Sequence, residues 1–362
     1  MEARRCHPPV KENFPLGDLT TFKIGGPARY FASITCEEQL AEAMTFARES
    51  GSALFVLGGG SNILVSDEGF PGLVIHNRLA GFAHRFDGGS VYVTAGAGED
   101  WDGIVRRCVE EGWQGLECLS GVPGTAGAAP VQNIGAYGQS AGSVISEVRA
   151  LDTHTGEAVF FTGEECGFGY RRSIFNSTAA GRYIITAVTF RLVPGGVPVS
   201  SYHALERQLR EAGELSLLKV REAVFAVRNA KGLLVLNGYD IFRSAGSFFK
   251  NPVIQPELYE EIKKTVADAG GCENWAWPQT SGEIKVSAAC LIQCAGFVRG
   301  LRRGAVGISP RHTLIIINHR DAKAGEVIAF AREIREKVLG KFHITIQPEV
   351  QFVGFSNDRP LL

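Results

Sequence analysis

An uncharged segment from Cys118 to Ser146 constrains this sequence more than any other feature. It holds six glycines and two prolines, and its run Gly121–Gly138 consists mainly of small residues and amides. Ordered loops longer than about 12–15 residues are uncommon in compact domains unless they serve a function. Small residues allow close approach, amides supply hydrogen-bond donors, and Tyr137 can stack on a flat ring. The segment therefore favours a loop that packs against a large ligand, and a surface Ω-loop is the alternative.

A second glycine loop, Gly58–Asn62, follows the apolar run Ala53–Leu57. Peptide N–H groups in a glycine turn after a strand can face an anion, and Ser61 adds a hydroxyl group. The spacing matches neither the Gly-x-Gly-x-x-Gly pattern nor a phosphate-binding loop with Gly-Lys-Ser. A tight turn between two strands is the alternative. Taken together, two uncharged glycine loops suit a ligand that combines a pyrophosphate with a fused ring.

The rest of the chain alternates short helical and strand patterns. Its 362 residues exceed one typical domain, so we expect two or three domains. A Pro/Gly-rich stretch at Val193–Val199 indicates a boundary, and a second unit starts near residues 200–220. The patterns predict helices at Cys36–Ser50, Asp100–Glu111 (capped by Asp100 or Glu99), Ala204–Ala212, Val220–Arg228, Leu258–Ala269 and Gly325–Leu339, and strands at Ala53–Leu57, Gly72–Ile75, Ser90–Ala95, Ser146–Leu151, Glu157–Phe161, Arg182–Leu192, Thr313–Asn318 and His343–Val353.

Composition argues against several classes of protein. The 37 basic side chains face 38 acidic ones, so the basic surplus that a nucleic-acid-coating surface needs is missing. No uncharged run suits a lipid bilayer, and the charged N-terminus lacks the pattern of a secretory signal. We therefore expect a cytoplasmic protein without nucleic-acid or membrane partners.

The cysteines predict neither disulfides nor a metal site. Eight cysteines are too dilute for a disulfide scaffold, and a reducing compartment would keep them as thiols. Cys290 and Cys294 stand four residues apart in a helical run without a nearby Cys/His pair. We expect both as buried core thiols rather than as metal ligands.

Three further stretches carry candidate polar groups. Tyr170 and Arg171 lie between two strand-like segments and could present a ring and a planar cation to a carboxylate, or lie in a solvated loop. Ser247 stands beside two phenylalanines and is either a reactive buried hydroxyl or an ordinary one at a strand end. Glu349 interrupts an apolar C-terminal run, so it is either exposed at a sheet edge or held in a polar site with a shifted pKa.

Five motifs in order give the chain a family resemblance. They are Leu-Gly-Gly-Gly-Ser-Asn, Pro-Gly-Thr-Ala-Gly-Ala-Ala-Pro-Val-Gln-Asn-Ile-Gly-Ala-Tyr-Gly, Phe-Gly-Tyr-Arg-Arg-Ser-Ile-Phe, Ala-Gly-Ser-Phe-Phe-Lys-Asn-Pro and Gln-Pro-Glu-Val. Between about Asn13 and Gly354 the chain resembles the UDP-N-acetylenolpyruvoylglucosamine reductases, FAD- and NADPH-dependent enzymes of bacterial cell-wall precursor synthesis. These enzymes reduce the enolpyruvyl group of UDP-N-acetylglucosamine enolpyruvate to give UDP-N-acetylmuramate.

The resemblance implies an α+β fold with a flavin domain of the vanillyl-alcohol-oxidase type in two lobes and a smaller C-terminal substrate-binding domain. The implied boundaries are residues 13–79 and 80–215 for the two lobes, 216–342 for the substrate-binding domain and 343–362 for a C-terminal strand that returns to the active site. It also implies non-covalent FAD, NADPH as co-substrate, a UDP-sugar as the other small-molecule partner, and a monomer.

The resemblance also assigns residues by motif. Arg171 and Glu349 flank the enolpyruvyl group, and Ser247 donates the proton. Tyr170 shares that site, and Tyr202 resembles a tyrosine that closes over the sugar nucleotide in the longer subtype of the family. Lys231 and Asn251 resemble residues of the nucleotide-sugar channel. The implied FAD contacts are Gly58, Gly59, Gly60, Ser61, Asn62, Gly124, Thr125, Ala128, Ala129, Asn133, Gly135, Ala136 and Tyr137.

Two departures from the family pattern leave local questions. After Lys231 the chain reads Gly-Leu-Leu-Val-Leu where the family commonly has Leu-Pro, and the tract Arg299–Arg303 is either a solvated loop or a contact for the substrate diphosphate. Two other functions stay open at this point. One is alcohol or sugar-acid oxidation with covalently bound FAD, although neither glycine loop has a His or Cys at an obvious attachment point. The other is a nucleotide-sugar sensor without redox activity.

Overall fold

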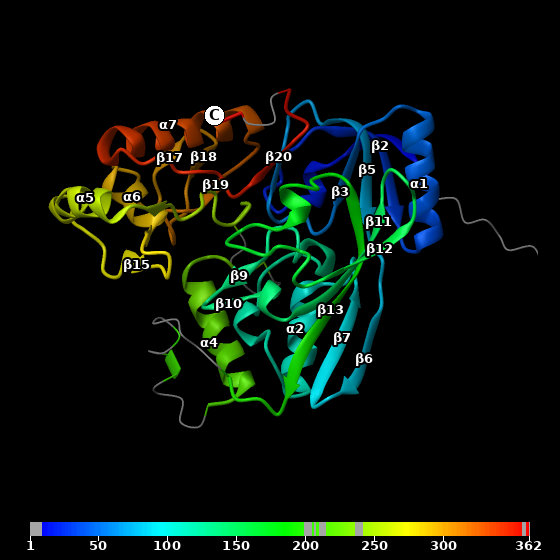
Figure 1. The fold of residues 1–362 in the computed structure, drawn as a ribbon. Helices are drawn as coiled ribbons and strands as arrows, with labels where there is room; N and C mark the ends of the chain where they lie inside the picture. Colours follow the sequence, from blue (N-terminus) through cyan, green and yellow to red (C-terminus); the bar gives the residue numbers. More distant parts are fainter. Residues whose placement is uncertain are drawn as a thin grey trace, which may run out of the picture.

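The structure, a computed structural model, describes residues 9–198, 205, 208–209, 215–235, 242–356 and 360–361. Two larger sheets form most of the N-terminal part, and a smaller, helix-rich part holds α5, α6 and α7 (Figure 1). Helices and strands are mixed along the chain without a repeating β-α-β order. The predicted α+β class is therefore confirmed.

The first sheet lies near the N-terminus and is mainly parallel. In the order β1-β2-β5-β3 it comprises β1 (Lys11–Pro15), β2 (Pro27–Ile34), β5 (Phe70–Asn77) and β3 (Leu54–Leu57). Helix α1 (Glu37–Glu49) packs Leu40, Ala43 and Met44 against it. The three- and four-residue spacing of these side chains gives the helix one apolar face.

The second sheet is antiparallel and carries the uncharged segment on its connections. It comprises β6 (Phe82–Asp87), β7 (Ser90–Gly96), β8 (Trp113–Gln114), β11 (Ile145–Asp152), β12 (Ala158–Thr162) and β13 (Tyr183–Pro194). Helix α2 (Trp101–Glu110) follows β7, and the Asp100 carboxylate accepts the Gly103 N–H at 2.8 Å. This identifies Asp100 as the N-cap.

Short elements shape the loops around this sheet. They are η1 (Gly17–Leu19), η2 (Glu117–Leu119), η3 (Ala126–Ala128), β9 (Gly135–Ala136), β10 (Gln139–Ser140), η4 (Ala141–Ser143) and η5 (Ile174–Asn176). The uncharged segment is thus an ordered series of turns rather than an open Ω-loop.

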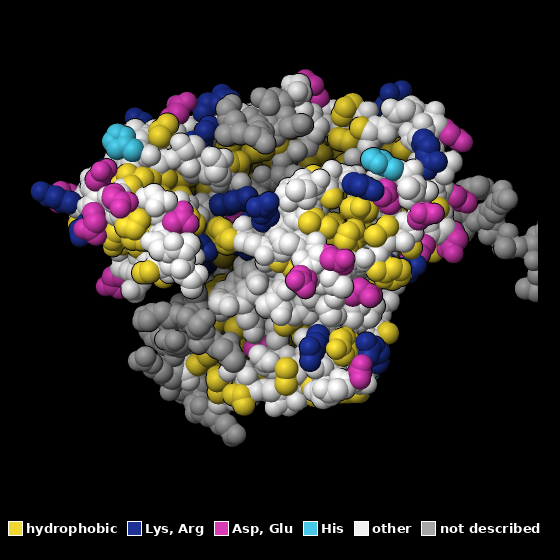
Figure 2. Space-filling view, viewed as in Figure 1, with side chains coloured by type: hydrophobic (Ala, Val, Ile, Leu, Met, Phe, Trp, Pro, Cys, Tyr) yellow, Lys and Arg dark blue, Asp and Glu magenta, His cyan; other side chains and the backbone are white. Residues whose placement is uncertain are grey.

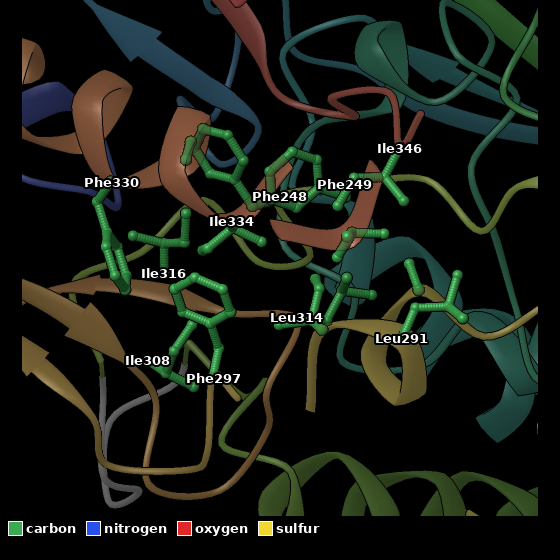
Figure 3. Close-up of a cluster of buried hydrophobic side chains, with 14 of the residues drawn as sticks. Phe248, Phe249, Leu291, Phe297, Ile308, Leu314, Ile316, Phe330, Ile334 and Ile346 are labelled. Carbon is green, nitrogen blue, oxygen red and sulfur yellow. The ribbon is translucent and has the colours of Figure 1, made fainter. Parts of the chain in front are cut away.

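The C-terminal part surrounds one core. Its elements are β14 (Val253–Ile254), α5 (Pro256–Asp268), β15 (Ala276–Pro278), β16 (Ile284–Val286), α6 (Ala288–Cys294), β17 (Arg302–Arg303), β18 (Val306–Ile308), β19 (Ile316–Asn318) and α7 (Ala324–Phe342). Phe248, Phe249 and Leu291 are among the side chains that fill this core together with α7 (Figure 3). Phe22 and Leu64 of the N-terminal part are buried in the same cluster. This core therefore connects the N-terminal and C-terminal parts of the molecule, in addition to stabilising the C-terminal part.

One helix crosses a predicted domain boundary, and the C-terminal strand returns to the first lobe. Helix α4 (Leu217–Ala230) belongs to the predicted substrate-binding domain, yet Val220 and Val224 pack with Cys118 and Tyr137 of the uncharged segment. The short strand β20 (Gln351–Val353) pairs in parallel with β4 (Ile63–Val65), so the C-terminal end returns to the first lobe. The boundaries themselves stay predictions.

The element predictions hold best where the periodic pattern is long. Five of the six predicted helices coincide with α1, α2, α4, α5 and α7, whereas Ala204–Ala212 lies mostly outside the described residues. The strand predicted at His343–Val353 is wrong over most of its length. His343 ends α7 in a left-handed conformation, and between it and β20 only Pro348 forms a β-bridge, with Phe249. The strand predicted from Thr313 begins only at Ile316.

The expectation that all cysteines are thiols is also wrong. Cys272 and Cys290 form a disulfide that links the chain after α5 to α6, with Cα atoms 6.0 Å apart. Cys294 is a buried thiol whose sulfur lies within 4.8 Å of both. The separation of 18 residues between these cysteines matches no short cysteine motif, so the pairing was not predicted.

The surface mixes charges of both signs on the face shown in Figure 2. None of the helices that the structure describes combines the length and apolar content that crossing a bilayer requires.

A carboxylate from the first lobe stabilises the start of α7. Asp67 accepts the backbone N–H groups of Ala324 at 2.8 Å and Gly325 at 3.0 Å. We expect Asp67→Ala to lower the free energy of unfolding by about 1 kcal/mol, because two N–H groups at a helix start lose their acceptor. Asp67→Asn keeps one acceptor and should cost less. Urea unfolding of both variants tests this, and equal loss in the two would contradict it.

Candidate active site

The two glycine loops meet face to face. Ser61 donates its hydroxyl hydrogen to the Pro123 carbonyl at 3.1 Å. A Cβ atom placed on Gly59 would lie 2.9 Å from the Cα atom of Gly124, and one on Gly58 would lie 2.7 Å from the Thr125 hydroxyl. Only glycine permits this backbone approach. The structure thus brings together two loops that stand about sixty residues apart in the sequence.

The first loop presents unused hydrogen-bond donors. Among the described residues, no protein acceptor takes the backbone N–H groups of Gly58 to Asn62. The Gly60 carbonyl, in contrast, accepts the Thr21 N–H at 3.1 Å, which holds the turn in place. A row of such N–H groups in a glycine turn is the donor set that binds phosphate oxygens. This arrangement fits the pyrophosphate predicted from the sequence.

Asn62 forms hydrogen bonds with two segments that are distant in the sequence. Its amide donates to the Gln132 side chain at 3.0 Å and to the Glu349 carbonyl at 3.2 Å. Its own carbonyl accepts the Gln351 N–H at 3.0 Å. The side chain predicted as an FAD contact therefore joins both glycine loops to the C-terminal segment.

Arg171 and Glu349 form an ion pair in the site. Arg171 Nε lies 2.6 Å from Glu349 Oε1, and the side chains are only 18% and 10% exposed. The Nε–H does not align as a hydrogen bond, so the contact is mainly electrostatic. Arg171 Nη1 donates to the Gly135 carbonyl at 3.0 Å, which links the pair to the second glycine loop. The two predicted residues thus meet across 178 positions of sequence.

Burial raises the pKa of Glu349, while Arg171 and then Lys250 oppose this. The Glu349 side chain is only 10% exposed, which rules out the alternative of an edge-exposed carboxylate. A carboxyl group with a raised pKa keeps its proton to higher pH and can donate a hydrogen bond. Glu349 is placed by antiparallel contacts, because its N–H donates to the Phe248 carbonyl at 2.8 Å.

Ser247 precedes that contact and has an unengaged hydroxyl. Residues 248–250 run beside 347–349, with a β-bridge between Phe249 and Pro348. No hydrogen bond links the Ser247 hydroxyl to any described residue. A role limited to satisfying a buried backbone group is therefore not observed. The hydroxyl is half-buried and close in the fold to Glu349.

Tyr170 is a platform shared by both parts of the molecule. Its phenol oxygen accepts the Asn251 N–H at 3.4 Å, and the Asn251 side-chain oxygen accepts the Ala288 N–H at 3.0 Å. Lys285 places its ammonium group 3.5 Å from the centre of the Tyr170 ring. Burial raises the pKa of Tyr170, which stays a neutral phenol at neutral pH.

A second group of cations surrounds Lys231, which ends α4 at its C-cap. Its ammonium group lies 5.7 Å from the centre of the Tyr137 ring. Burial lowers the pKa of Lys231, and the neighbouring Arg228 lowers it further. Burial, assisted by Lys231 and Arg299, also lowers the pKa of His312 to about 4. This group favours an anionic occupant.

His312 and Arg299 line a cavity of about 160 Å³ next to α6, together with Cys272, Trp275 and Cys290. Arg302 and Arg303 are exposed in β17, where Arg303 pairs with Glu333 at 3.5 Å. The sequence left open whether the tract Arg299–Arg303 is solvated or contacts a ligand. In the structure Arg299 lines a cavity, whereas Arg302 and Arg303 face solvent.

Several residues predicted to contact FAD make structural contacts inside the protein. Asn133 donates to the Gly169 carbonyl at 3.0 Å and accepts the Gly142 N–H at 2.8 Å, so its side chain holds the loop together. Ala129 is fully buried, and the Tyr137 ring is buried against α4 rather than open for stacking. Ala128 is exposed, while Ala136 is half-buried and pairs in β9. Tyr202 lies outside the described residues.

Two family models match the sequence. The model of the family "UDP-N-acetylenolpyruvoylglucosamine reductase, C-terminal domain" matches residues 238–353, and that of the "FAD binding domain" matches residues 28–162. The reductase of that name from Thermobifida fusca is 40% identical over 349 residues, covering 94% of this chain and 97% of the relative. The chain belongs to the UDP-N-acetylenolpyruvoylglucosamine reductase family.

Other reductases agree in sequence and in fold. The Salinispora arenicola reductase is 40% identical, with 94% of each chain covered. The crystal structure of the Thermus caldophilus reductase is 27% identical and superposes with a TM-score of 0.65, covering 95% of this chain and 98% of that one. The FAD-domain match agrees with the flavin domain that the resemblance implied, and the chain is an FAD-containing oxidoreductase.

Sequence reasoning missed two side chains of the site. Gln132 lies in the second glycine loop and has no distinguishing sequence signal, yet its side chain accepts a hydrogen bond from Asn62. Lys285 carried no motif, because it stands in a short strand with ordinary polar alternation. The sequence distinguishes Lys285 only by its place shortly before the apolar start of α6.

Proposed function

We propose that this chain catalyses the NADPH-dependent reduction, through non-covalently bound FAD, of UDP-N-acetylglucosamine enolpyruvate to UDP-N-acetylmuramate. The observation that carries the proposal is the Arg171–Glu349 pair, held against the second glycine loop by the Gly135 carbonyl. It combines a cation that can bind a carboxylate with an acid of raised pKa, next to a glycine turn that can bind phosphate. UDP-N-acetylmuramate serves peptidoglycan precursor synthesis.

The first glycine loop would hold the FAD pyrophosphate. The free N–H groups of Gly58–Asn62 supply the donors, and the close packing of Gly59 on Gly124 shapes the cradle. Bound FAD supplies the hydride that NADPH replenishes. The backbone of Gly135 and Ala136 would approach the flavin ring, while the Tyr137 ring supports the loop from behind through its contacts with α4.

Arg171 would bind the substrate carboxylate. Hydride addition to the methylene carbon builds negative charge onto the carbon next to that carboxylate. Arg171 has an Nη2 group beyond its contacts with Glu349 and Gly135, and Glu349 in its protonated form can donate a hydrogen bond to the same charge. Preorganised donors of this kind are worth about 3–4 kcal/mol each.

Ser247 would then supply the proton. The neighbouring carbon must receive one from a single face, and the unengaged hydroxyl of Ser247 is free to give it. Its position next to Phe248 fixes its distance from Glu349 through the paired backbones.

The cations around Lys231 would bind the diphosphate of the sugar nucleotide. Lys231 and Arg299 both influence His312, so they approach one region of the site. Asn251 would contribute its side-chain amide, and Tyr202 would close over the sugar. In the cell we expect a cytoplasmic monomer that uses no metal.

The glycine contact tests the flavin site. We expect Gly59→Val to yield protein without FAD, because the new side chain meets the Gly124 backbone at 2.9 Å and spreads the cradle. Gly135 is a poorer site for this test, since a Cβ there also lies 3.4 Å from Arg171. Flavin absorbance of the purified protein gives the result. Gly340→Val, where nothing lies within 4 Å, is the control, and a fully yellow Gly59→Val variant would refute the placement.

Ser247→Ala should separate the two half-reactions. Flavin reduction by NADPH takes no proton from Ser247, so its rate should persist. Flavin reoxidation by the enolpyruvyl substrate should slow by about 10²–10⁴-fold, as for loss of a general acid. Rapid mixing measures each step, and equal slowing of both would show that Ser247 is not the donor.

Glu349 should set a pH limit on reoxidation. Burial raises its pKa, so the protonated form persists to higher pH and is lost as pH rises through that pKa. We expect the reoxidation rate to fall over this range in the unaltered enzyme. Glu349→Gln keeps a neutral donor and should lose this pH dependence. The pH profiles of the two proteins decide the matter: the same alkaline fall in both would exclude Glu349.

A further inference from the structure

Three cysteine sulfurs converge between α5 and α6. Cys290 and Cys294 stand four residues apart in α6, so they share one face of the helix, and Cys272 joins them from the chain after α5. All three sulfurs lie within 4.8 Å of one another. Elsewhere in the described ranges, no three side chains of His, Cys, Asp or Glu place their ligand atoms this close together. The cluster therefore has the composition of a site for a thiophilic metal ion.

The backbone around the cluster is held by contacts other than the disulfide. The Ser287 hydroxyl accepts the Cys290 N–H at 3.3 Å and caps the start of α6. The Val266 carbonyl of α5 accepts the Gly271 N–H at 2.8 Å and also the Cys294 S–H at 3.9 Å. Backbone contacts thus hold the segments that carry the three sulfurs close together, also when the disulfide is reduced.

The spacing of the sulfurs suits a zinc ion. Zinc–sulfur bonds are about 2.3 Å long, so two sulfurs on a tetrahedral zinc lie about 3.8 Å apart. Sulfurs that already lie within 4.8 Å of one another need only small side-chain rotations to reach this spacing. The disulfide and the metal would both use the sulfurs of Cys272 and Cys290. The oxidised form and the metal-bound form therefore exclude each other.

A cavity of about 160 Å³ gives access to the cluster. Cys272 and Cys290 line it together with Arg299, so a cation can reach two of the sulfurs from this side, and the cavity has room for a water molecule as the fourth ligand. His312 lines the same cavity, but its Nδ1 accepts the Leu314 N–H at 3.1 Å. In the neutral ring this leaves the hydrogen on Nε2, so the sulfurs are the ligands.

The charges near the cluster also suit such a site. Three thiolates and one Zn²⁺ ion leave one surplus negative charge. The Lys341 ammonium group donates to the Cys294 carbonyl at 2.6 Å, and Arg299 lines the adjoining cavity. Both cations would offset the surplus charge. Thiolates favour Zn²⁺ over Mg²⁺ and Ca²⁺, which prefer oxygen ligands.

We propose that Cys272, Cys290 and Cys294, when reduced, bind one zinc ion, with a water molecule as the fourth ligand. A dithiol reduces the Cys272–Cys290 bridge by supplying two electrons and two protons, and it becomes a disulfide itself. Zinc then binds the three sulfurs and releases their three protons. The site is separate from the proposed reaction. It departs from the sequence-based expectation for Cys290 and Cys294 because the fold adds Cys272 as a third sulfur.

Cobalt(II) and zinc test the site in the FAD-loaded enzyme. The protein is reduced with dithiothreitol, freed of this dithiol by gel filtration without oxygen, and titrated with Co²⁺. We expect one Co²⁺ ion per chain, with the absorption of tetrahedral thiolate coordination in the red, beyond the flavin bands. Zn²⁺ should displace it. Protein that retains the disulfide should bind neither ion at this site.

Alanine variants identify the ligands. Cys294→Ala removes one sulfur and should weaken Zn²⁺ binding by more than about 100-fold, because losing even an outer contact to a metal ligand costs about 10- to 100-fold. Cys272→Ala should have the same effect, and its half-buried position keeps the test valid if Cys294→Ala folds poorly. Cys36→Ala removes a half-buried thiol before α1 and is the control. Flavin content reports whether each variant is folded.

Several results would overturn the proposal. One is unchanged Zn²⁺ affinity in both Cys294→Ala and Cys272→Ala, and another is an equal loss in Cys36→Ala. Failure of the fully reduced enzyme to bind either ion would do the same, as would a Co²⁺ spectrum typical of octahedral oxygen coordination. Equal binding by the reduced and the disulfide-bonded protein would show that the ion does not use these sulfurs.

Discussion

The return of the C-terminal segment to the first glycine loop is the constraint on which the site depends. Strand β20 pairs with β4, and Asn62 binds the Glu349 carbonyl at 3.2 Å. On its other side the same segment receives the Lys250 N–H and donates the Glu349 N–H to Phe248. Glu349 is thus held between the two parts of the molecule. Without this contact, neither its distance from Arg171 nor its place beside Ser247 would be fixed.

The Arg171–Glu349 pair is better understood as a reactive arrangement than as a source of stability. Removing two charges from water costs several kcal/mol each, and their attraction often does no more than offset this. The pair is also incompletely satisfied, since the Arg171 Nε–H lacks an aligned acceptor. A ligand that brings its own carboxylate would find donors in place. The folded chain therefore retains an arrangement that favours binding over stability.

The sequence predicts the parts of this site far better than their assembly. Glycine-rich turns such as Gly58–Asn62 are local, so their pattern reveals them. The pairing of Arg171 with Glu349 has no local signal and came from the family resemblance. Lys285 escaped detection because its importance lies in the distance to Tyr170, which no spacing encodes. The Cys272–Cys290 disulfide was not predicted for the same reason. The strand prediction for His343–Val353 was wrong because apolar residues in an extended chain resemble a strand whether or not a partner strand is present.

Backbone conformation shows how strongly the fold specifies the reactive region. Asn133, Tyr137 and Arg171 all have positive φ angles, of 45°, 49° and 53°. Asparagine adopts this conformation readily, but for tyrosine and arginine it costs about 1–2 kcal/mol each. The surrounding contacts must offset that cost: the Asn176 amide donates to the Arg171 carbonyl at 3.1 Å, and the Tyr137 ring is buried against α4. Because the left-handed turn at Arg171 directs its side chain to Gly135 and Glu349, relaxing the backbone would release the cation from the site. The strain is therefore part of what preorganises the guanidinium for its ligand.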